Sequence, residues 1–350
     1  MPQKPIDIRV VDEQSRPLWD SYVQKHPDHS PYHMFAWPQA VNKAYKHPVK
    51  HFAAIIDNNI VGVLPVVLFS IPLLGSSICS LPYCDIGGCL ADTKEIKLSL
   101  ETKAAELKSS IGAKSTEYRE RGIEPKDDSD LNNKKVSMLL SLPDDADTLM
   151  SGFKSKLRSQ IRKAEKNGLE YELGLQPKLI DEFYQILSKN MLRLGSPVHS
   201  KKFYHSICQE YDQNCIISIV RKQEKAIGGG LILFSKDKVC IPWASTLVEY
   251  NNLSPNMLLY WSLLKYSTEH GCRKFDFGRS TYNEGTFKFK QQWGALPVPL
   301  NWRTDNQTES KTSKNTKTGG VRRLVESTWR KMPLPLANFI GPQIRKYISL

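Results

Sequence analysis

The sequence lacks the features that mark disulfide-rich, zinc-binding and exported proteins. It has seven cysteines, an odd number, and none of them shows metal-ligand spacing. The first residues, MPQKPIDIRVVDEQ, contain no apolar core of a signal peptide. We therefore expect reduced, buried cysteines, no metal site and a cytoplasmic location, with the inner-membrane surface as an additional contact.

One long uncharged run, residues 60–83, is about as long as a membrane-spanning helix. Three prolines and two glycines interrupt it, and its valines and isoleucines favour strands. The run therefore predicts two buried strands joined by a turn.

Charge and composition limit the partners. A chain of 350 residues with 40% hydrophobic and 24% charged residues can form two globular domains. Its formal net charge of +13 indicates an anionic partner, such as nucleic acid, a phosphate-bearing substrate or an anionic membrane. No nucleic-acid-binding module is recognisable, so we do not expect DNA binding.

Functional residue types gather in DFGRSTYNEGTFKFKQQWGA, residues 276–295. Asp276 lies between two phenylalanines in period-2 alternation, which predicts a strand that ends at Gly278. The loop that follows carries three polar candidates: Arg279, Tyr282 and Glu284. Alternation then resumes in TFKFK and predicts a second strand, with Lys288 and Lys290 on one face.

Upstream, a helix is predicted between Pro255, at its first position, and Gly271, after its last turn, with Ser254 as N-cap. The stretches IISIV, GGGLILF and KVCIPWAS predict three strands before it. Strands, a capped helix and further strands follow one another in this order in N-acetyltransferase (GNAT) domains.

With NxLSPN, DFGRS and FKxxWG at these places, residues 150–304 resemble the FemAB-related acyltransferase family. SPYHMFAW, IVGVLP and LPYCDIGG extend the resemblance into the first half, and the related exosortase-associated (PEP-CTERM) FemAB-like proteins suggest an exopolysaccharide setting. The resemblance implies an α/β (α+β) fold of two tandem GNAT-like domains, each a mixed, mostly antiparallel sheet flanked by helices. The expected parts are domains at residues 1–149 and 150–304, a linker at 305–320 and a basic amphipathic tail at 321–350.

The chemistry that this resemblance implies is acyl transfer to an amine. Lys290 matches the family's FK lysine beside the reacting carbonyl, so we expect it to stabilise the oxyanion; a solvated strand lysine is the alternative. Tyr282, Arg279 and Glu284 would orient the acyl donor or relay a proton. Asp276 is either a third catalytic group or a buried acid bonded to backbone donors. No Ser-His-Asp or Cys-His arrangement is legible, so we do not expect a covalent acyl-enzyme.

Four further residues are candidates for binding the acceptor substrate. Arg193 and His199 flank a Gly-Ser-Pro turn, and in the family an arginine after a helix helps to hold the acceptor; a structural histidine is the alternative for the second. Tyr83 and Asp92 flank a glycine pair, and Asp92 matches the family's acceptor-binding acid. An ordinary tight turn also explains the glycines.

The segment KSKLRSQIRKAEKNG, residues 154–168, has six basic residues and one acid. Leu157, Ile161 and Ala164 keep helical spacing. The segment is therefore either a docked helix with a solvated basic face or a surface for a diphosphate-linked or RNA-linked substrate.

The acyl donor stays open between aminoacyl-tRNA and acyl-coenzyme A, and we expect no permanently bound cofactor. Coenzyme A enzymes of the GNAT class carry a glycine-containing pyrophosphate turn before the capped helix, where this chain has EYNNLSPN. Better-known FemAB members use aminoacyl-tRNA but have a long coiled-coil arm, for which this chain has no room.

We therefore expect an enzyme that adds an acyl or aminoacyl group to a phosphate-bearing cell-envelope or exopolysaccharide precursor. A non-catalytic GNAT-scaffold binding protein of an envelope assembly complex and a coenzyme A-dependent N-acyltransferase are the alternatives. The tail, residues 321–350, mixes apolar and basic side chains. It would lie on an anionic membrane or pack back on the second domain.

Overall fold

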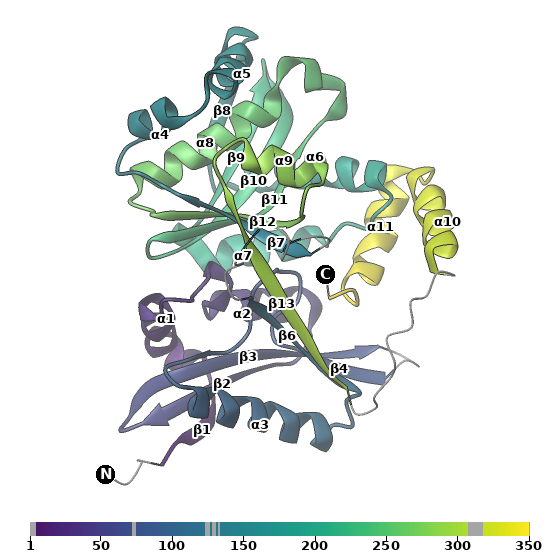
Figure 1. The fold of residues 1–350 in the computed structure, drawn as a ribbon. Helices are drawn as coiled ribbons and strands as arrows, with labels where there is room; N and C mark the ends of the chain where they lie inside the picture. The colour runs from purple at the N-terminus through teal and green to yellow at the C-terminus, as the bar shows by residue number, and fades with distance from the viewer. Residues whose placement is uncertain are drawn as a thin grey trace. The chain divides into compact units, whose positions relative to one another are not determined.

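A computed structural model describes residues 5–71, 75–122, 127, 131, 134–306 and 318–349 (Figure 1). The chain divides into two compact units. The first comprises residues 1–130, 298–311 and 349–350, and the second comprises residues 131–297 and 312–348.

The first unit is a sheet with helices beside it. Its strands are β1 (Asp7–Val11), β2 (Val49–Ile56), β3 (Asn59–Ile71), β4 (Gly75–Cys79), β6 (Ser115–Arg121) and β13 (Leu296–Asn306), with β5 (Leu90–Ala91) paired to β3. Neighbouring strands are antiparallel except β4 and β6, which are parallel. Its helices are α1 (Arg16–Lys25), α2 (Ala36–Tyr45) and α3 (Lys94–Ser110). Strands β3 and β4 confirm that the uncharged run does not form a helix.

The second unit has the expected order of strands around a capped helix. Its sheet runs β7 (Lys135–Ser141), β12 (Lys274–Thr281), β11 (Lys238–Thr246), β10 (Lys225–Ser235), β9 (Cys215–Lys222) and β8 (Leu169–Gly174). Its helices are α4 (Ala146–Gly152), α5 (Ser155–Lys166), α6 (Pro177–Leu194), α7 (Lys201–Tyr211), α8 (Pro255–Glu269), α9 (Gly285–Gln291), α10 (Thr318–Arg330) and α11 (Leu334–Arg345). Among the described strands of this sheet, only β11 and β12 pair in parallel. The α/β class and the GNAT order are confirmed.

Two strands cross the predicted domain boundaries. Strand β7, expected to end the first domain, pairs with β12 of the second unit. Strand β13 pairs through Leu300–Asn306 with β6 of the first unit, so residues 305 and 306 are strand rather than linker. An apolar pattern identifies a strand but not its partner, which is chosen by contacts far apart in sequence. Most of the expected linker, residues 307–317, lies outside the described residues.

The prediction of a strand at TFKFK was wrong, because residues Gly285–Gln291 form helix α9. Phe287 and Lys290 are buried one helical turn apart, while Lys288 is exposed. A four-residue F-K-F-K run satisfies both periodicities, and the structure selects the one that buries Phe287 in the core of the second unit.

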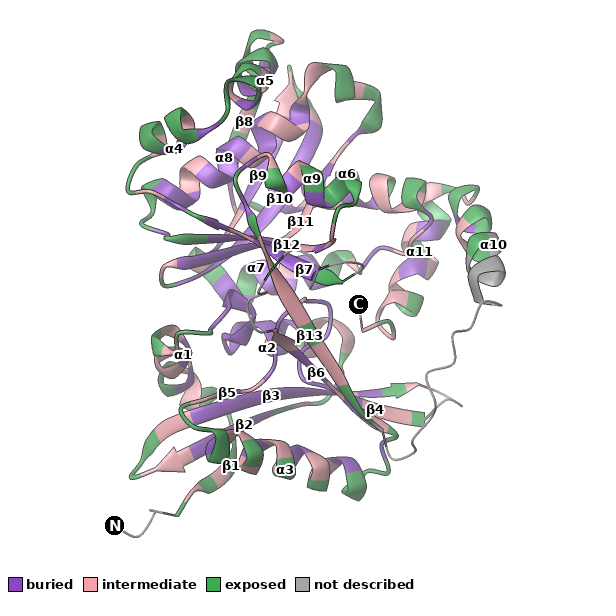
Figure 2. Cartoon of the chain, in the orientation of Figure 1, coloured by how far each residue is buried: buried purple, intermediate pink, exposed green. Residues whose placement is uncertain are grey.

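Burial follows the predicted patterns elsewhere (Figure 2). In α5, Leu157, Ile161 and Ala164 are buried, as the helical spacing predicts. Helix α8 begins with Pro255 as expected, but Ser254 has a φ of 65° and its side chain makes no cap hydrogen bond. No disulfide joins the seven cysteines, and all except the half-buried Cys89 are buried. Among the described helices, none combines the length and apolar composition needed to cross a membrane.

Strands β11 and β12 separate after a short paired stretch, and this separation positions the site described next. Their parallel pairing covers Lys238–Cys240 and Lys274–Asp276. Beyond it, β11 continues to Thr246 and β12 turns at Gly278, whose φ of 73° favours glycine. The carbonyls of β12 past Asp276 therefore need other donors.

Candidate functional site

A pocket of about 320 Å³ lies in the second unit, beside the last residues of β11. Helices α6, α8 and α9 and the short 3-10 helix Val248–Leu253 supply the rest of its wall. Its aromatic lining side chains are Tyr260 and Phe289, and its other polar ones are Asn190, Arg193, Ser245, Thr246, Asn251, Asn256, Thr286 and Lys290. The pocket thus unites residues from five elements spread over about a hundred positions of sequence.

Lys290 is held on the pocket wall by backbone carbonyls of β12. Its Nζ donates to the oxygens of Gly278 at 2.9 Å and Arg279 at 2.8 Å, the carbonyls just past the end of the β11–β12 pairing. The residue is only 8% exposed. Its ammonium is therefore fixed in place. It also supplies hydrogen bonds to two carbonyls of β12 in the part where β12 no longer pairs with β11.

Arg193 is held at the pocket by its own helix. Its Nη2 and Nε donate to Asn190 Oδ1 at 2.8 and 3.2 Å, one turn earlier on α6. Asn190 Nδ2 in turn donates to Ser245 Oγ of β11 at 3.1 Å. The helix ends immediately afterwards at Gly195, whose φ is 77°. This chain of contacts ties an exposed guanidinium to the strand that lines the pocket.

The first turn of α8 completes the polar wall. Thr246 Oγ1 donates to Asn256 Oδ1 at 3.2 Å. Tyr260 lies one turn further, stacked on Phe277 at 5.7 Å and edge-on to Phe289 at 5.0 Å. Burial raises the pKa of Tyr260 to about 12, so its phenol stays protonated at neutral pH.

The charge of the pocket is positive. Arg193 and Lys290 are its charged lining residues, and among the described residues that line it there is no carboxylate and no imidazole. Such a pocket favours a ligand with a phosphate, a carboxylate or a carbonyl on which negative charge develops.

The domain that holds this pocket matches a known family. The acetyltransferase (GNAT) domain family matches residues 151–291. A lipid II:glycine glycyltransferase of Staphylococcus saprophyticus is 29% identical over 75 residues, which cover 19% of this chain and 18% of that protein. A Staphylococcus aureus protein of the same name is 27% identical over 75 residues, with the same coverage. The match thus spans less than a fifth of the length of these relatives.

Solved structures show the same fold over nearly the whole chain. A crystal structure of FemX covers 91% of this chain and 100% of its own, with a TM-score of 0.69 and 15% identity. A tandem GNAT protein from the clavulanic acid biosynthesis pathway covers 88% of this chain and 100% of its own, with a TM-score of 0.52 and 11% identity. Residues 151–291 therefore match the GNAT domain family, and the chain as a whole is similar in fold to FemX.

Asp276 is a buried strand-end acid. It accepts from Ser137 Oγ at 2.5 Å and from the backbone N–H of Gly278 at 2.8 Å. The residue is 7% exposed and is not among the pocket-lining residues. These contacts are the ones expected of the structural alternative for Asp276, a buried acid bonded to donors at a strand end.

The three loop candidates do not line the pocket with their side chains. Tyr282 packs edge-on against Phe287 at 4.8 Å. Arg279 is half-buried and contributes its carbonyl to Lys290. Glu284 is exposed at the N-cap of α9, without a side-chain cap bond. The loop therefore supports α9 and Lys290, and Arg279, Tyr282 and Glu284 are not among the described residues that line the pocket.

His199 lies in an aromatic cluster instead of the pocket. Its ring contacts Phe203 at 4.9 Å and Trp243 at 6.1 Å between centroids. Burial, together with the charge of Arg345, holds its pKa well below the usual range, so the ring is neutral. This position fits the structural alternative.

The two candidates in the first unit, Tyr83 and Asp92, do not line the pocket of that unit, which is described below. Tyr83 is buried with its ring against Tyr45 at 5.6 Å and has a φ of 64°. Asp92 is exposed and accepts from the hydroxyl of Tyr22 at 2.9 Å. Burial and this bond raise the pKa of Tyr22.

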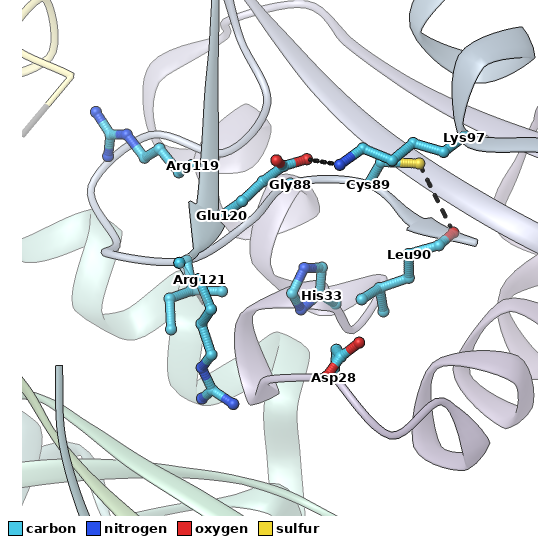
Figure 3. A pocket seen from close by; sticks show the side chains of 11 residues that line it. Asp28, His33, Gly88, Cys89, Leu90, Lys97, Arg119, Glu120 and Arg121 are labelled. Atoms are coloured by element: carbon cyan, nitrogen blue, oxygen red, sulfur yellow. Dashed lines mark hydrogen bonds and ion pairs between the residues drawn. The ribbon is translucent and has the colours of Figure 1, made fainter. Parts of the chain in front are cut away.

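The first unit has its own pocket of about 230 Å³, shown in Figure 3. In it Lys97 pairs with Glu120 at 2.9 Å, and burial lowers the pKa of His33 to about 3. A Cβ on Gly88 would lie 2.4 Å from Glu120 Cγ, and one on Gly87 would lie 2.3 Å from Leu81 Cβ. The glycine pair is thus explained by close packing within the unit.

Sequence reasoning missed the neutral part of the second unit's pocket. Asn190, Ser245 and Asn256 carry its hydrogen-bond chains, yet none was a candidate. A signal existed for Asn256, the last residue of NxLSPN, which was used only to recognise the family. Asn190 and Ser245 stand in ordinary helix and strand patterns, so only the fold brings them together.

Proposed function

We propose that this protein transfers an acyl or aminoacyl group to an amine of a phosphate-bearing cell-envelope precursor. One observation carries the proposal: Lys290 and Arg193, the cations expected at the carbonyl and at the acceptor, line the same pocket. The names of the staphylococcal relatives describe glycyl transfer to lipid II, a reaction of this class.

In this proposal Lys290 stabilises the oxyanion of the tetrahedral intermediate. A donor of this kind is effective when it is already in place, because no reorganisation is needed as charge develops. The two carbonyl bonds from β12 provide that fixed position. The buried wall around Lys290 strengthens its attraction for negative charge.

Arg193 binds the acceptor through a phosphate or carboxylate. Its planar guanidinium can donate two parallel hydrogen bonds to such a group. Asn190 holds it through a side-chain oxygen, which carries no formal charge, so the full positive charge stays available to a ligand.

The attacking amine must be neutral, and the described pocket lining offers no carboxylate or imidazole to deprotonate it. The amine proton then passes to solvent or to a basic group of the substrate. Tyr260, protonated at neutral pH, is suited to donate a hydrogen bond or a proton to the leaving group.

The donor would be aminoacyl-tRNA or acyl-coenzyme A. In α5, Lys156, Arg162, Lys163 and Lys166 are exposed on the side opposite its buried stripe. This face would attract the phosphates of either donor or of a diphosphate-linked acceptor. We place the reaction on the cytoplasmic side of the envelope, where peptidoglycan and exopolysaccharide precursors are both acceptors to test.

The test incubates the purified full chain with lipid-linked and nucleotide-linked precursors and each donor class, and follows product mass by mass spectrometry. A mass increase of one acyl or aminoacyl group, dependent on the donor, supports the proposal. Tight precursor binding without any mass increase under all donors would favour the non-catalytic binding protein.

A further inference from the structure

The last two helices expose large apolar side chains. Five of them belong to α10, α11 and the residues just after: Val325, Leu336, Phe339, Ile344 and Ile348. Phe339 is 75% exposed, Val325 58% and Leu336 46%. Figure 2 shows exposed residues along both helices. A phenylalanine left this far in water indicates a surface that is covered in use.

The inner face of α11 is already filled. Ala337 is 3% exposed, and Gly341, one turn later, is buried. A Cβ on Gly341 would lie 3.4 Å from the backbone nitrogen of Val198 and 3.5 Å from Trp329. Both helices contact α6. Phe339 and Leu336, which lie on the other side of α11, therefore do not belong to the core of the second unit.

The segment that carries these apolar side chains is rich in positive charge. Residues 321–350 contain six basic residues and a single acid, Glu326. Of the basic residues described, Arg323, Arg330 and Lys331 are exposed, and Arg345 and Lys346 are half-buried. Exposed apolar residues that share their helices with lysine and arginine complement an anionic lipid surface, where apolar side chains enter the headgroup boundary and the cations meet phosphates. A second copy of the same surface would oppose like charges.

We propose that this C-terminal surface, the exposed side chains of α10 and α11, docks on an anionic phospholipid bilayer. Phe339 and Leu336 insert at the interface, and the basic residues contact lipid phosphates. The observations are independent of the pocket, so this proposal does not rest on the transferase activity. It adds a reason why a lipid-linked precursor would be available to the protein.

Sedimentation of the full chain with vesicles tests this proposal. We expect binding to vesicles of phosphatidylcholine with phosphatidylglycerol, and at least tenfold weaker binding to phosphatidylcholine alone. The double variant Leu336→Ser/Phe339→Ser should lose at least tenfold in partitioning, because two large side chains no longer enter the lipid. Arg330→Glu/Lys331→Glu should weaken binding to anionic vesicles by about tenfold or more, and raised salt should do the same.

The matched control is Leu98→Ser, which removes a leucine 66% exposed on α3 and should leave partitioning unchanged. Equal vesicle binding by the wild type and the Leu336/Phe339 variant would overturn the proposal. So would absence of binding combined with a dimer that the same variant disperses, since the surface would then join two copies. All variants must keep the wild-type thermal unfolding midpoint.

Discussion

Arg193 and Lys290 reach the same pocket with different kinds of support. Lys290 is buried and its ammonium is bonded to two backbone carbonyls, so its loss affects the fold of β12 as well as the pocket. Arg193 is exposed and bonded to one side-chain amide of its own helix, so its removal leaves the backbone intact. Substitution of Lys290 is therefore expected to affect both stability and activity, whereas substitution of Arg193 is expected to affect ligand binding alone.

Arg193→Ala should raise the KM for the acceptor by at least tenfold and lower kcat by less. The reason is that a clamp on a phosphate or carboxylate holds the ground state and the transition state alike. Steady-state kinetics with varied acceptor measures the split. Lys189→Ala, an exposed cation on the same helix, is the control and should behave as the wild type. A fall in kcat with an unchanged KM would contradict the clamp.

Buried histidines give the first unit a defined dependence on pH. Burial lowers the pKa of His51 from 6.5 to about 3, and its ring stacks on Phe35 at 3.8 Å. Because the unfolded chain binds this proton between pH 6.5 and 3 and the folded chain does not, stability is full above pH 6.5. It is lost as the pH falls, by about 1.4 kcal/mol per pH unit for each such group.

His51→Phe should therefore reduce the slope of the unfolding free energy against pH, between pH 6.5 and 4, by about the contribution of one proton. The reason is that phenylalanine keeps the ring stack but cannot titrate. Chemical denaturation at several pH values, followed by circular dichroism, measures the slope. If the unfolding free energy has the same dependence on pH in both proteins, His51 is not held neutral by burial.

At the element scale, β12 and α9 form the structural centre of the site. Ser137 of β7 donates to Asp276 of β12, and Lys290 of α9 donates to the carbonyls that follow. The strand was predicted from its alternation, and α9 was mistaken for a strand because its short apolar pattern fits both periods. What decided between them is the burial of Phe287, which the local sequence does not encode.

Ser137→Ala should lower the free energy of unfolding by about 1–3 kcal/mol, because the buried carboxylate of Asp276 loses the hydroxyl that donates to it at 2.5 Å. Activity at a temperature where the variant is folded should fall by less than tenfold if Asp276 is structural. Urea denaturation and the transfer assay together check this. Unchanged stability with a large loss of kcat would instead assign Asp276 a catalytic role.

At the scale of the whole molecule, the α/β class and the order of GNAT elements were predictable, because strand runs, a helix beginning at proline and turn residues are local signals. The unit boundaries were not, since β7 and β13 pair with strands far away in sequence. The lining of the pocket was likewise predictable only in part. Arg193 and Lys290 were candidates on family resemblance, whereas Asn190 and Ser245 complete it only through the fold.

The central claim is that a fixed cation in the second unit's pocket stabilises an acyl-transfer intermediate. Turnover of Lys290→Ala, compared with Lys288→Ala on the same helix, tests it most directly, because Lys288 is exposed and is not among the pocket-lining residues. We expect kcat to fall by roughly two to three orders of magnitude for Lys290→Ala and to stay near wild type for Lys288→Ala. Both variants are compared at a temperature where circular dichroism shows them folded. Equal, small losses in the two folded variants would contradict the account.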